Sequence, residues 1–269
     1  MRLINRQPGP GARIALAALP FVVLLLVYVL GSDARLAANP DDKLLPSLAQ
    51  MGETLRQYAL EENVRTGGYL FWDDTWASLR RLGLALGVSA LLALTIGILV
   101  GTIPLLGAAA SPFLAVVSMI PPLAILPILF IVFGLDELSK VMLIVLGIAP
   151  VMARDLEQRA REIPTEWIVK AQTLGANTWT LMARVVLPQL MPRLLIALRL
   201  ALGSAWLFLI AAEAIASTEG LGYRIFLVRR YMAMDVILPY VAWITLLAWT
   251  MDALLKRATR RWFPWHEGR

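Results

Sequence analysis

Long, uninterrupted apolar segments dominate the sequence. The first runs from Ile14 to Leu30, and no charged residue occurs between Leu82 and Leu135. A helix needs roughly 20 apolar residues to cross the hydrocarbon core of a bilayer, so the second stretch is long enough for two spans. Its Gly-, Pro- and Ala-rich middle, from Pro104 to Pro112, predicts a tight turn between those spans.

Three further apolar segments complete the pattern, namely Leu138–Ala153, Leu200–Ala216 and Val236–Met251. Lys140 near the start of the first of these is tolerable if its ammonium group reaches the headgroups. The sequence therefore predicts an all-α, polytopic helical membrane protein with six transmembrane helices.

The expected organisation follows from these spans. We expect an N-terminal tail and a first membrane anchor (1–31), an exterior segment (32–81), a core domain (82–257) and a short tail (258–269). The first apolar segment could also be a signal peptide, but its length and the Gly31-Ser32-Asp33 sequence after it favour an uncleaved anchor.

Composition narrows the class of function. Hydrophobic residues make up 59% of the chain and charged residues 16%, and the formal net charge is +6. Charge-free apolar stretches make basic loops beside anionic lipid a better explanation of this charge than nucleic-acid binding. The chain has no cysteine, and its one histidine, His266, lies in the polar tail. No metal, cofactor or catalytic constellation is predicted, so we do not expect an enzyme.

The distribution of Lys and Arg predicts the orientation. Six spans place both termini on one side, and the basic residues favour that side as cytoplasmic by a modest margin.

The loop from Arg154 to Arg193 is too long to be a simple turn. Pro164 followed by Glu166 predicts a helix start, and Gly175 predicts its end. A second helix is expected to end at Pro188. A helical hairpin of this kind on the cytoplasmic side is suited to docking another protein.

Within this loop stand Val169-Lys170-Ala171-Gln172-Thr173-Leu174-Gly175 and, nine residues later, Val185-Val186-Leu187-Pro188. The pattern resembles the signature of ABC importer permeases, Glu-Ala-Ala-x-x-x-Gly, nine residues, Ile-x-Leu-Pro. The chain departs from it at Val169 and Lys170, which replace Glu and Ala. Glu166, one helical turn earlier, is an alternative source of negative charge.

Other segments occur in the order seen in the nitrate/sulfonate/taurine branch of these permeases: Leu45-Pro46-Ser47, Ser78-Leu79-Arg80-Arg81, Pro121-Pro122-Leu123-Ala124, Ala205-Trp206 and Gly220-Leu221-Gly222-Tyr223. The resemblance extends over residues 44–257. It implies a type I importer permease in a bacterial inner membrane, paired with a second permease copy, two ATPase subunits and a soluble substrate-binding protein. The ATPase-coupling residues it implies are Glu166, Lys170, Ala171, Leu174, Gly175, Leu187 and Pro188.

An ATP-driven role needs a partner chain, because this sequence contains no Gly-x-x-x-x-Gly-Lys-Ser/Thr loop to bind nucleotide phosphates. A secondary transporter or channel that uses no ATP is the main alternative, and a membrane-embedded enzyme is a more remote one. The branch is associated with nitrate, sulfonates, bicarbonate and nitrogenous compounds. Residues 223–240 look most like the branch members that are associated with urea-carboxylase-type enzymes, and this resemblance suggests a urea- or guanidine-like solute.

Glu213 is the ionisable residue placed deepest in a predicted span. It could line the translocation pathway or form a gate, or it could be a structural carboxylate bonded to a neighbouring helix. Arg199 is not its partner within one helix, because 14 residues of helix separate the two by about 21 Å.

Prolines and glycines add packing hypotheses. Pro121 and Pro122 are expected to break the third span, either as a pathway wall or as a packing kink. The pairs Gly83/Gly87 and Gly97/Gly101 favour close helix contact.

Basic and aromatic residues near the ends of the last spans suggest surface roles. Arg224, Arg229 and Arg230 either steer anions or a binding protein, or lie on a solvated helix. Trp262 and Trp265 are expected to anchor the chain at the interface.

Overall fold

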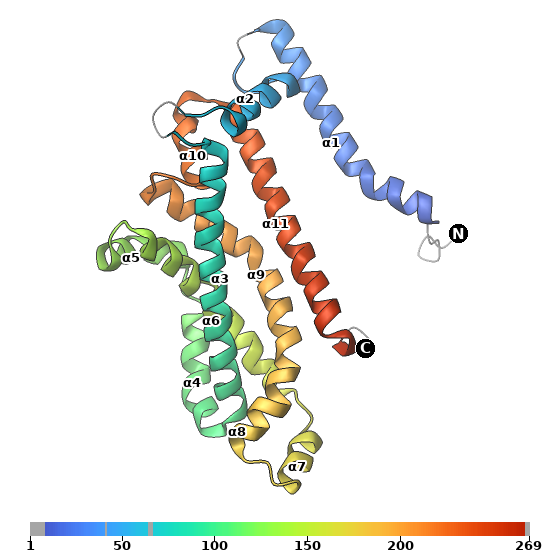
Figure 1. Cartoon of the computed structure of the whole chain (residues 1–269), viewed down its shortest axis with the longest axis vertical. Coiled ribbons are helices and arrows are strands. Elements are labelled where there is room, and N and C mark those ends of the chain that lie inside the picture. The colour runs from blue at the N-terminus through green and yellow to red at the C-terminus, as the bar shows by residue number, and fades with distance from the viewer. Residues whose placement is uncertain (1–8, 41, 64–66, 267–269) are drawn as a thin grey trace. The chain divides into compact units, whose positions relative to one another are not determined.

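The computed structural model describes residues 9–40, 42–63 and 67–266. These residues divide into two compact units. Unit 1 combines Met1–Tyr69 with Val228–Tyr240, and unit 2 combines Leu70–Leu227 with Val241–Arg269. All regular elements of the described residues are helical, as predicted (Figure 1).

The helices follow one another with short connections. Their bounds are α1 (Pro10–Ala38), α2 (Leu48–Leu60), α3 (Leu70–Thr102), α4 (Pro104–Val117), α5 (Leu126–Phe133), α6 (Glu137–Arg161), α7 (Thr165–Thr173), α8 (Thr178–Leu181), α9 (Leu187–Ala216), α10 (Leu221–Val228) and α11 (Met234–Trp262). Short 3₁₀ turns occupy Pro122–Ile125, Arg229–Tyr231 and Pro264–His266, and a π-helical turn occupies Met182–Val186.

Within the described residues, four helical segments are long and apolar enough to cross a membrane: Pro10–Ala38, Leu70–Thr102, Thr178–Ala216 and Met234–Trp262. A fifth span is reached if the bent pair Pro104–Val117 and Pro122–Phe133 counts as one. The sixth predicted segment is α6, which is a 25-residue helix. It falls outside this group because charged residues flank its apolar segment, with Glu137 and Lys140 at the start and Arg154, Asp155 and Glu157 in the second half.

Unit 1 is held together by polar contacts of α1 with the segment before α2, and of α2 with the start of α11. From α1, Tyr28 donates a hydrogen bond to the Pro46 carbonyl (2.7 Å), and Ser32 donates to the Leu45 carbonyl (2.9 Å). From α2, Thr54 donates to the Asp235 carboxylate (2.9 Å). A capping box between Ser47 and Gln50 begins α2.

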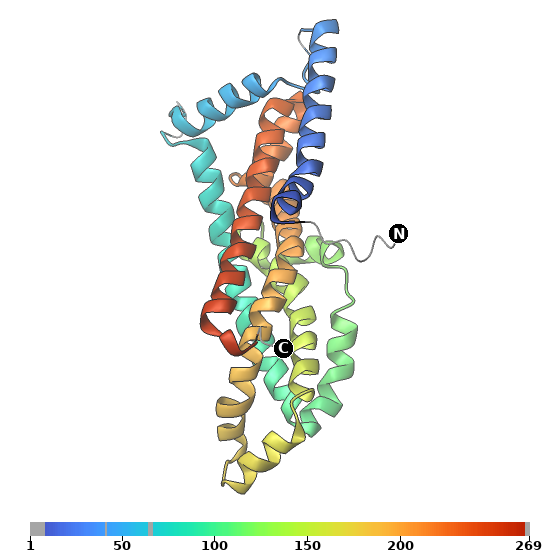
Figure 2. The same cartoon turned by 90° about the vertical axis from the view of Figure 1, so that its right-hand side faces the viewer.

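Unit 2 is built around α3 and α6, which pack side by side (Figures 1 and 2). A Cβ atom on Gly97 would lie 2.6 Å from the Cβ of Leu156, and one on Gly101 would lie 2.5 Å from that of Ala160. The second glycine pair therefore permits close packing, as predicted. The same test finds nothing within 4 Å of Gly83 or Gly87, so these two residues do not serve the contact.

The hairpin predicted between Leu82 and Leu135 is present, and its turn is tighter than expected. Only Ile103 separates α3 from α4, which carries Pro104 in its first turn. Pro112 lies inside α4 instead of in the turn.

The residues from Leu70 to Arg81, which belong to the expected exterior segment (32–81), form the first turns of α3. One sequence expectation needs correction. The second helix of the central loop does not end at Pro188, because it runs from Thr178 through to Ala216. The π turn explains this continuity: Leu187 donates its N–H to the Met182 carbonyl five residues earlier, and this wider turn accommodates a proline ring.

Candidate functional site

The predicted docking loop lies at one end of unit 2, where Figures 1 and 2 both show α7 and α8 beyond the ends of α3 and α6. The turn after α7 follows the sequence prediction. Gly175 has φ +86°, and its N–H donates to the Gln172 carbonyl (2.9 Å). The next N–H, of Ala176, donates to the Ala171 carbonyl (3.0 Å). This pair of bonds is a Schellman motif, which favours glycine because only it adopts positive φ without a steric cost.

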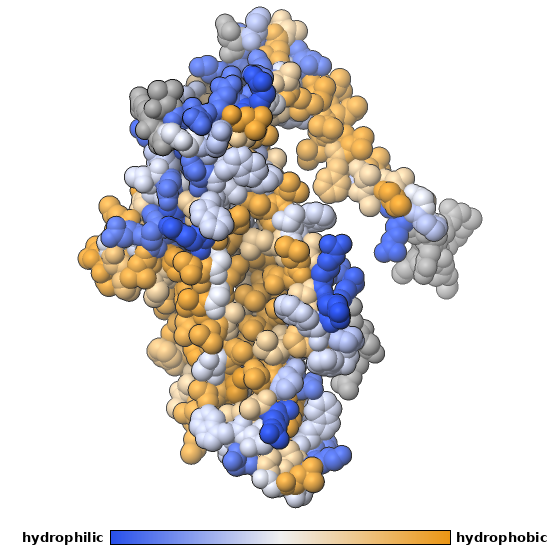
Figure 3. All heavy atoms as spheres, viewed as in Figure 1, coloured by the Kyte–Doolittle hydropathy of each residue, from blue (hydrophilic) through white to orange (hydrophobic). Residues whose placement is uncertain are grey.

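The surface of this loop is polar with exposed apolar tips. Leu174 is 80% exposed and Trp179 71% exposed. Glu166 and Lys170 are also exposed, and Ala171 is half-buried. Apolar side chains left in water at the tip of a short, rigid hairpin are typical of a protein-docking surface. Figure 3 shows more polar side chains at this end and apolar ones over the middle of the unit.

The coupling residues predicted from the resemblance are not all at the tip. The structure places Glu166, Lys170 and Ala171 on α7, with Leu174 and Gly175 in the turn that ends it. Leu187 and Pro188 instead begin α9 at the base of the loop, next to the buried Val186. They can orient the loop through the start of α9, whereas the tip residues are available for contact.

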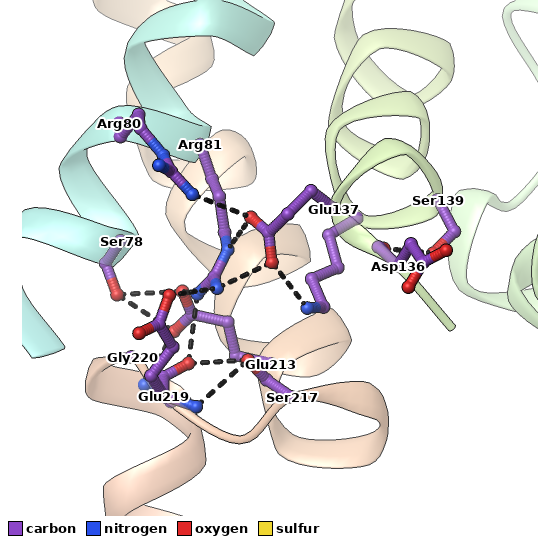
Figure 4. Close-up of polar contacts among 12 residues, drawn as sticks. Ser78, Arg80, Arg81, Asp136, Glu137, Ser139, Glu213, Ser217, Glu219 and Gly220 are labelled. Carbon is purple, nitrogen blue, oxygen red and sulfur yellow. Dashed lines mark hydrogen bonds and ion pairs between the residues drawn. The ribbon is translucent and has the colours of Figure 1, made fainter. Parts of the chain in front are cut away.

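A second set of polar residues in unit 2 is centred on Arg81 of α3 (Figure 4). Arg81 is 1% exposed, and its Nη1 donates to Oε1 of the fully buried Glu213 at 2.8 Å. Its Nε and Nη2 donate to the two carboxylate oxygens of Glu137 at 2.6 and 2.8 Å. The guanidinium group thus joins α3 to α6 and α9.

The remaining acceptor positions of Glu213 are also filled. The hydroxyl of Ser78 lies 2.8 Å from Oε1, and the N–H of Gly222 donates to Oε2 at 2.9 Å. The same hydroxyl accepts the N–H of Leu221 at 2.9 Å. Buried carboxylates are stable only when they are paired and hydrogen-bonded in this way.

A neighbouring ion pair, Asp74 with Arg224, holds the segment after α9 that also contacts Glu213. Asp74, 1% exposed, accepts from Nε of Arg224 at 2.7 Å and from the N–H of Gly220 at 2.9 Å. The segment from Gly220 to Arg224 is therefore bound to α3 at several points. We call Asp74, Ser78, Arg81, Glu137, Glu213 and Arg224 the polar clasp.

These contacts bear on the sequence hypotheses. Arg224 does not lie on a solvated helix, because its side chain is 12% exposed and paired with Asp74. Arg229 and Arg230 are exposed. Arg199 is bound to Asp252 of α11 through two hydrogen bonds of 2.8 and 3.0 Å.

Pro121 and Pro122 interrupt the apolar segment as predicted. Helix α4 ends at Val117, and the helical segment that resumes at Pro122 is bent by 81° from it. The ring of Pro122 lies near Gly147 of α6, where an added Cβ would be 3.2 Å from Cγ. The bend is thus supported by packing against α6.

Sequence reasoning missed Asp74 and Arg81 as partners of the turn after α9. Arg81 is part of the Ser78-Leu79-Arg80-Arg81 segment that carries the family resemblance, and Asp74 lies seven positions before Arg81. One signal in the sequence could have found them. A carboxylate buried in a span requires a cation within reach, so Glu213 called for an arginine or lysine from another helix.

Several apolar helices of membrane-spanning length and one bent pair of apolar helices indicate a helical membrane protein. Comparison with known proteins agrees. The family described as "Binding-protein-dependent transport system inner membrane component" matches residues 93–264, and the chain belongs to this family.

Individual relatives support the same assignment. The chain is 36% identical to the taurine transport system permease protein TauC of Escherichia coli over 195 residues, which cover 72% of this chain and 71% of the relative. It is 27% identical to the putative aliphatic sulfonates transport permease protein SsuC of Bacillus subtilis, over 92% of this chain and 86% of the relative.

The fold has a match among solved structures. A chain of the MetNI methionine ABC transporter in an inward facing conformation superposes with a TM-score of 0.63 at 20% identity, over 72% of this chain and 96% of that chain. At this level of identity the match concerns the fold. The predicted all-α permease fold is confirmed, and the chain is a multi-pass membrane transport component of an ABC importer.

Proposed function

We propose that this chain conducts a small organic sulfonate or a similar polar solute across the bacterial inner membrane, driven by two ATPase subunits that dock on residues 166–188. The observation that carries the proposal is the rigid, exposed helix–turn–helix loop with its Schellman turn at Gly175. α8 and α9 form one continuous helical segment, with no flexible joint between them. A movement of the partner against the loop is therefore transmitted into α9.

The substrate class is supported by the relatives, whose printed names refer to taurine and to aliphatic sulfonates. A urea- or guanidine-like solute was suggested by residues 223–240, and the two classes differ in charge. We favour the sulfonate class because both relatives are named for sulfonates and both match most of this chain.

The proposed assembly contains two copies of this chain, two ATPases and one soluble binding protein on the outer face. Both termini lie in the cytoplasm in this arrangement, since the docking loop must face the ATP pool. Glu166, Lys170, Leu174 and Gly175 form the contact with the ATPase.

Uptake into proteoliposomes tests the proposal. The complex purified with its ATPase and binding protein should accumulate labelled taurine only with ATP inside the compartment that the docking loop faces. Accumulation that needs no nucleotide, with no ATPase retained on purification, would support the secondary-transporter alternative. Uptake of guanidinium but not of sulfonates would reject the substrate class while leaving the ATP-driven mechanism intact.

A further inference from the structure

A cavity of about 450 Å³ lies beside the docking loop in unit 2. Its walls come from the end of α6, the start of α7, the start of α9 and the C-terminal turn. The lining residues are Arg159, Glu162, Ile163, Pro164, Trp167, Gln189, Leu190, Arg193 and Trp265. This volume falls within the range of about 300–1,000 Å³ that is common for small-ligand sites.

The two arginines of the cavity differ in their surroundings. Arg159 is neutralised by Glu162 at 2.9 Å and by Asp155 at 3.7 Å. Arg193 is half-buried in the wall and forms no hydrogen bond or ion pair with any residue that the structure describes. Among the residues that the structure describes, Arg193 is therefore the cationic side chain of the cavity that no acidic group pairs. A guanidinium group has five donors in a planar fork, which matches the oxygen atoms of a phosphate.

The aromatic residues indicate the level of the cavity in the membrane. Trp265 is 57% exposed and lies edge-to-face against Phe263, with ring centroids 5.4 Å apart. Trp262, at the end of α11, is 63% exposed. Tryptophans at the end of a spanning helix gather at the headgroup region, where lipid phosphates lie. Ile163 and Leu190 supply an apolar wall beside the uncompensated arginine.

We propose that this cavity binds the phosphate group of an anionic phospholipid, with Arg193 as its principal ligand and Trp265 as one wall. The glycerol end of the headgroup contacts the polar residues Gln189 and Glu162, and the acyl chains leave the cavity along its apolar side. A bound lipid would link the C-terminal turn to the base of α7, and so hold the docking loop at a fixed height above the bilayer. The inference requires only that the chain is embedded in a membrane, and it does not depend on the identity of the transported solute.

The test uses the full-length chain purified in detergent and depleted of lipid. Short-chain phosphatidylglycerol is titrated while the melting temperature is recorded, and short-chain phosphatidylcholine and glycerol 3-phosphate serve as parallel ligands. Phosphatidylglycerol should raise the melting temperature in a saturable manner, and the other two compounds should not. An equal effect of glycerol 3-phosphate would overturn the lipid assignment in favour of a free phosphate compound.

The variants locate the site. Arg193→Gln should weaken the apparent affinity for phosphatidylglycerol about tenfold, because a charge-assisted hydrogen bond is lost, and Arg193→Lys should retain part of it. Arg154→Gln removes an equally charged, exposed side chain of α6 that does not line the cavity, and it should bind as the unchanged chain does. Equal affinity in Arg193→Gln and Arg154→Gln would overturn the proposal.

A measurement on the unchanged chain guards against misfolding of the variants. In nanodiscs of phosphatidylcholine alone, the chain should melt at a lower temperature than in nanodiscs that also contain phosphatidylglycerol. Identical melting in the two membranes would also overturn the proposal.

Discussion

Arg81 and Glu213, 132 positions apart in the sequence, form a buried ion pair with an Nη1 to Oε1 distance of 2.8 Å. Both side chains are almost completely excluded from solvent, at 1% and 0% exposure. Glu213 is therefore bonded to a neighbouring helix, which is the structural alternative of the two weighed from the sequence. A gate at this position would need the clasp to open, and opening would expose Arg81 as well as Glu213.

Breaking one side of this pair should strongly destabilise the chain. In Arg81→Ala the carboxylate stays buried without its cation, and such losses cost about 3–5 kcal/mol. Glu213→Gln should also destabilise, because the amide NH₂ of Gln is a donor that replaces one of the two acceptors, either the one facing Arg81 or the one facing Gly222. The readouts are the yield and the melting temperature of the purified complex, together with transport per folded molecule.

Glu219→Gln is the matched control for Glu213→Gln. Glu219 also lies near Arg81, at 3.2 Å, but its side chain is 51% exposed. Exposed pairs contribute about 0–1 kcal/mol, so the control should melt close to the unchanged chain. Normal stability of Glu213→Gln combined with a lowered transport rate per molecule would instead identify Glu213 as a gate or pathway residue.

The two glycine pairs of α3 should respond differently to the same change. Gly97→Val and Gly101→Val place atoms within about 2.6 Å of α6 side chains, so the helices must separate and the melting temperature should fall. Gly83→Val and Gly87→Val enter open space and should leave the melting temperature near that of the unchanged chain. A comparable loss in all four variants would mean that helix propensity, not packing against α6, governs the effect.

Much of the fold could be predicted from the sequence. The length of an apolar segment and the glycines and prolines that interrupt or end a helix are local signals. The hairpin at Ile103, the break at Pro121 and the turn at Gly175 were all indicated by residues within a few positions of the feature. The same locality explains what the pattern leaves out. The charged and aromatic residues before Leu82 carry no local sign that they continue into the following apolar helix, because their buried partners are far away in the sequence.

The polar clasp shows why the site could only be predicted in part. Asp74 meets Arg224, and Ser78 meets Glu213, across 150 and 135 positions of sequence. No periodicity or spacing rule links such residues, because their contact depends on how α3 packs against α9 and α10. Arg224 was consequently read as a surface residue, although its charge is matched inside the protein.

Gly220 provides a third test of the clasp. It has φ +119°, and an added Cβ would lie 2.5 Å from the carboxylate of Glu213. Gly220→Ala should therefore lower the melting temperature through both backbone strain and displacement of Glu213. Gly203→Ala, at a site with nothing within 4 Å, is the control and should behave as the unchanged chain. Equal melting of the two variants would show that the turn can move away from Glu213 at little cost.

The last prediction tests whether docking of the ATPase depends on the backbone conformation of the docking loop at Gly175. Gly175 has φ +86°, and nothing lies within 4 Å of a Cβ added there, so any effect of substitution comes from the backbone conformation. Gly175→Val disfavours the left-handed conformation by about 1–2 kcal/mol or more, because valine is β-branched. Gly175→Asn adds a side chain of similar size that tolerates this conformation. Valine should reduce ATPase retention on the purified permease and ATP-driven uptake, whereas asparagine should preserve both, and the melting temperature of the membrane helices should change little in either variant. If the valine variant retains its ATPase and transports at the full rate, the Schellman turn is not needed for docking, and the assignment of residues 166–188 as the ATPase contact fails.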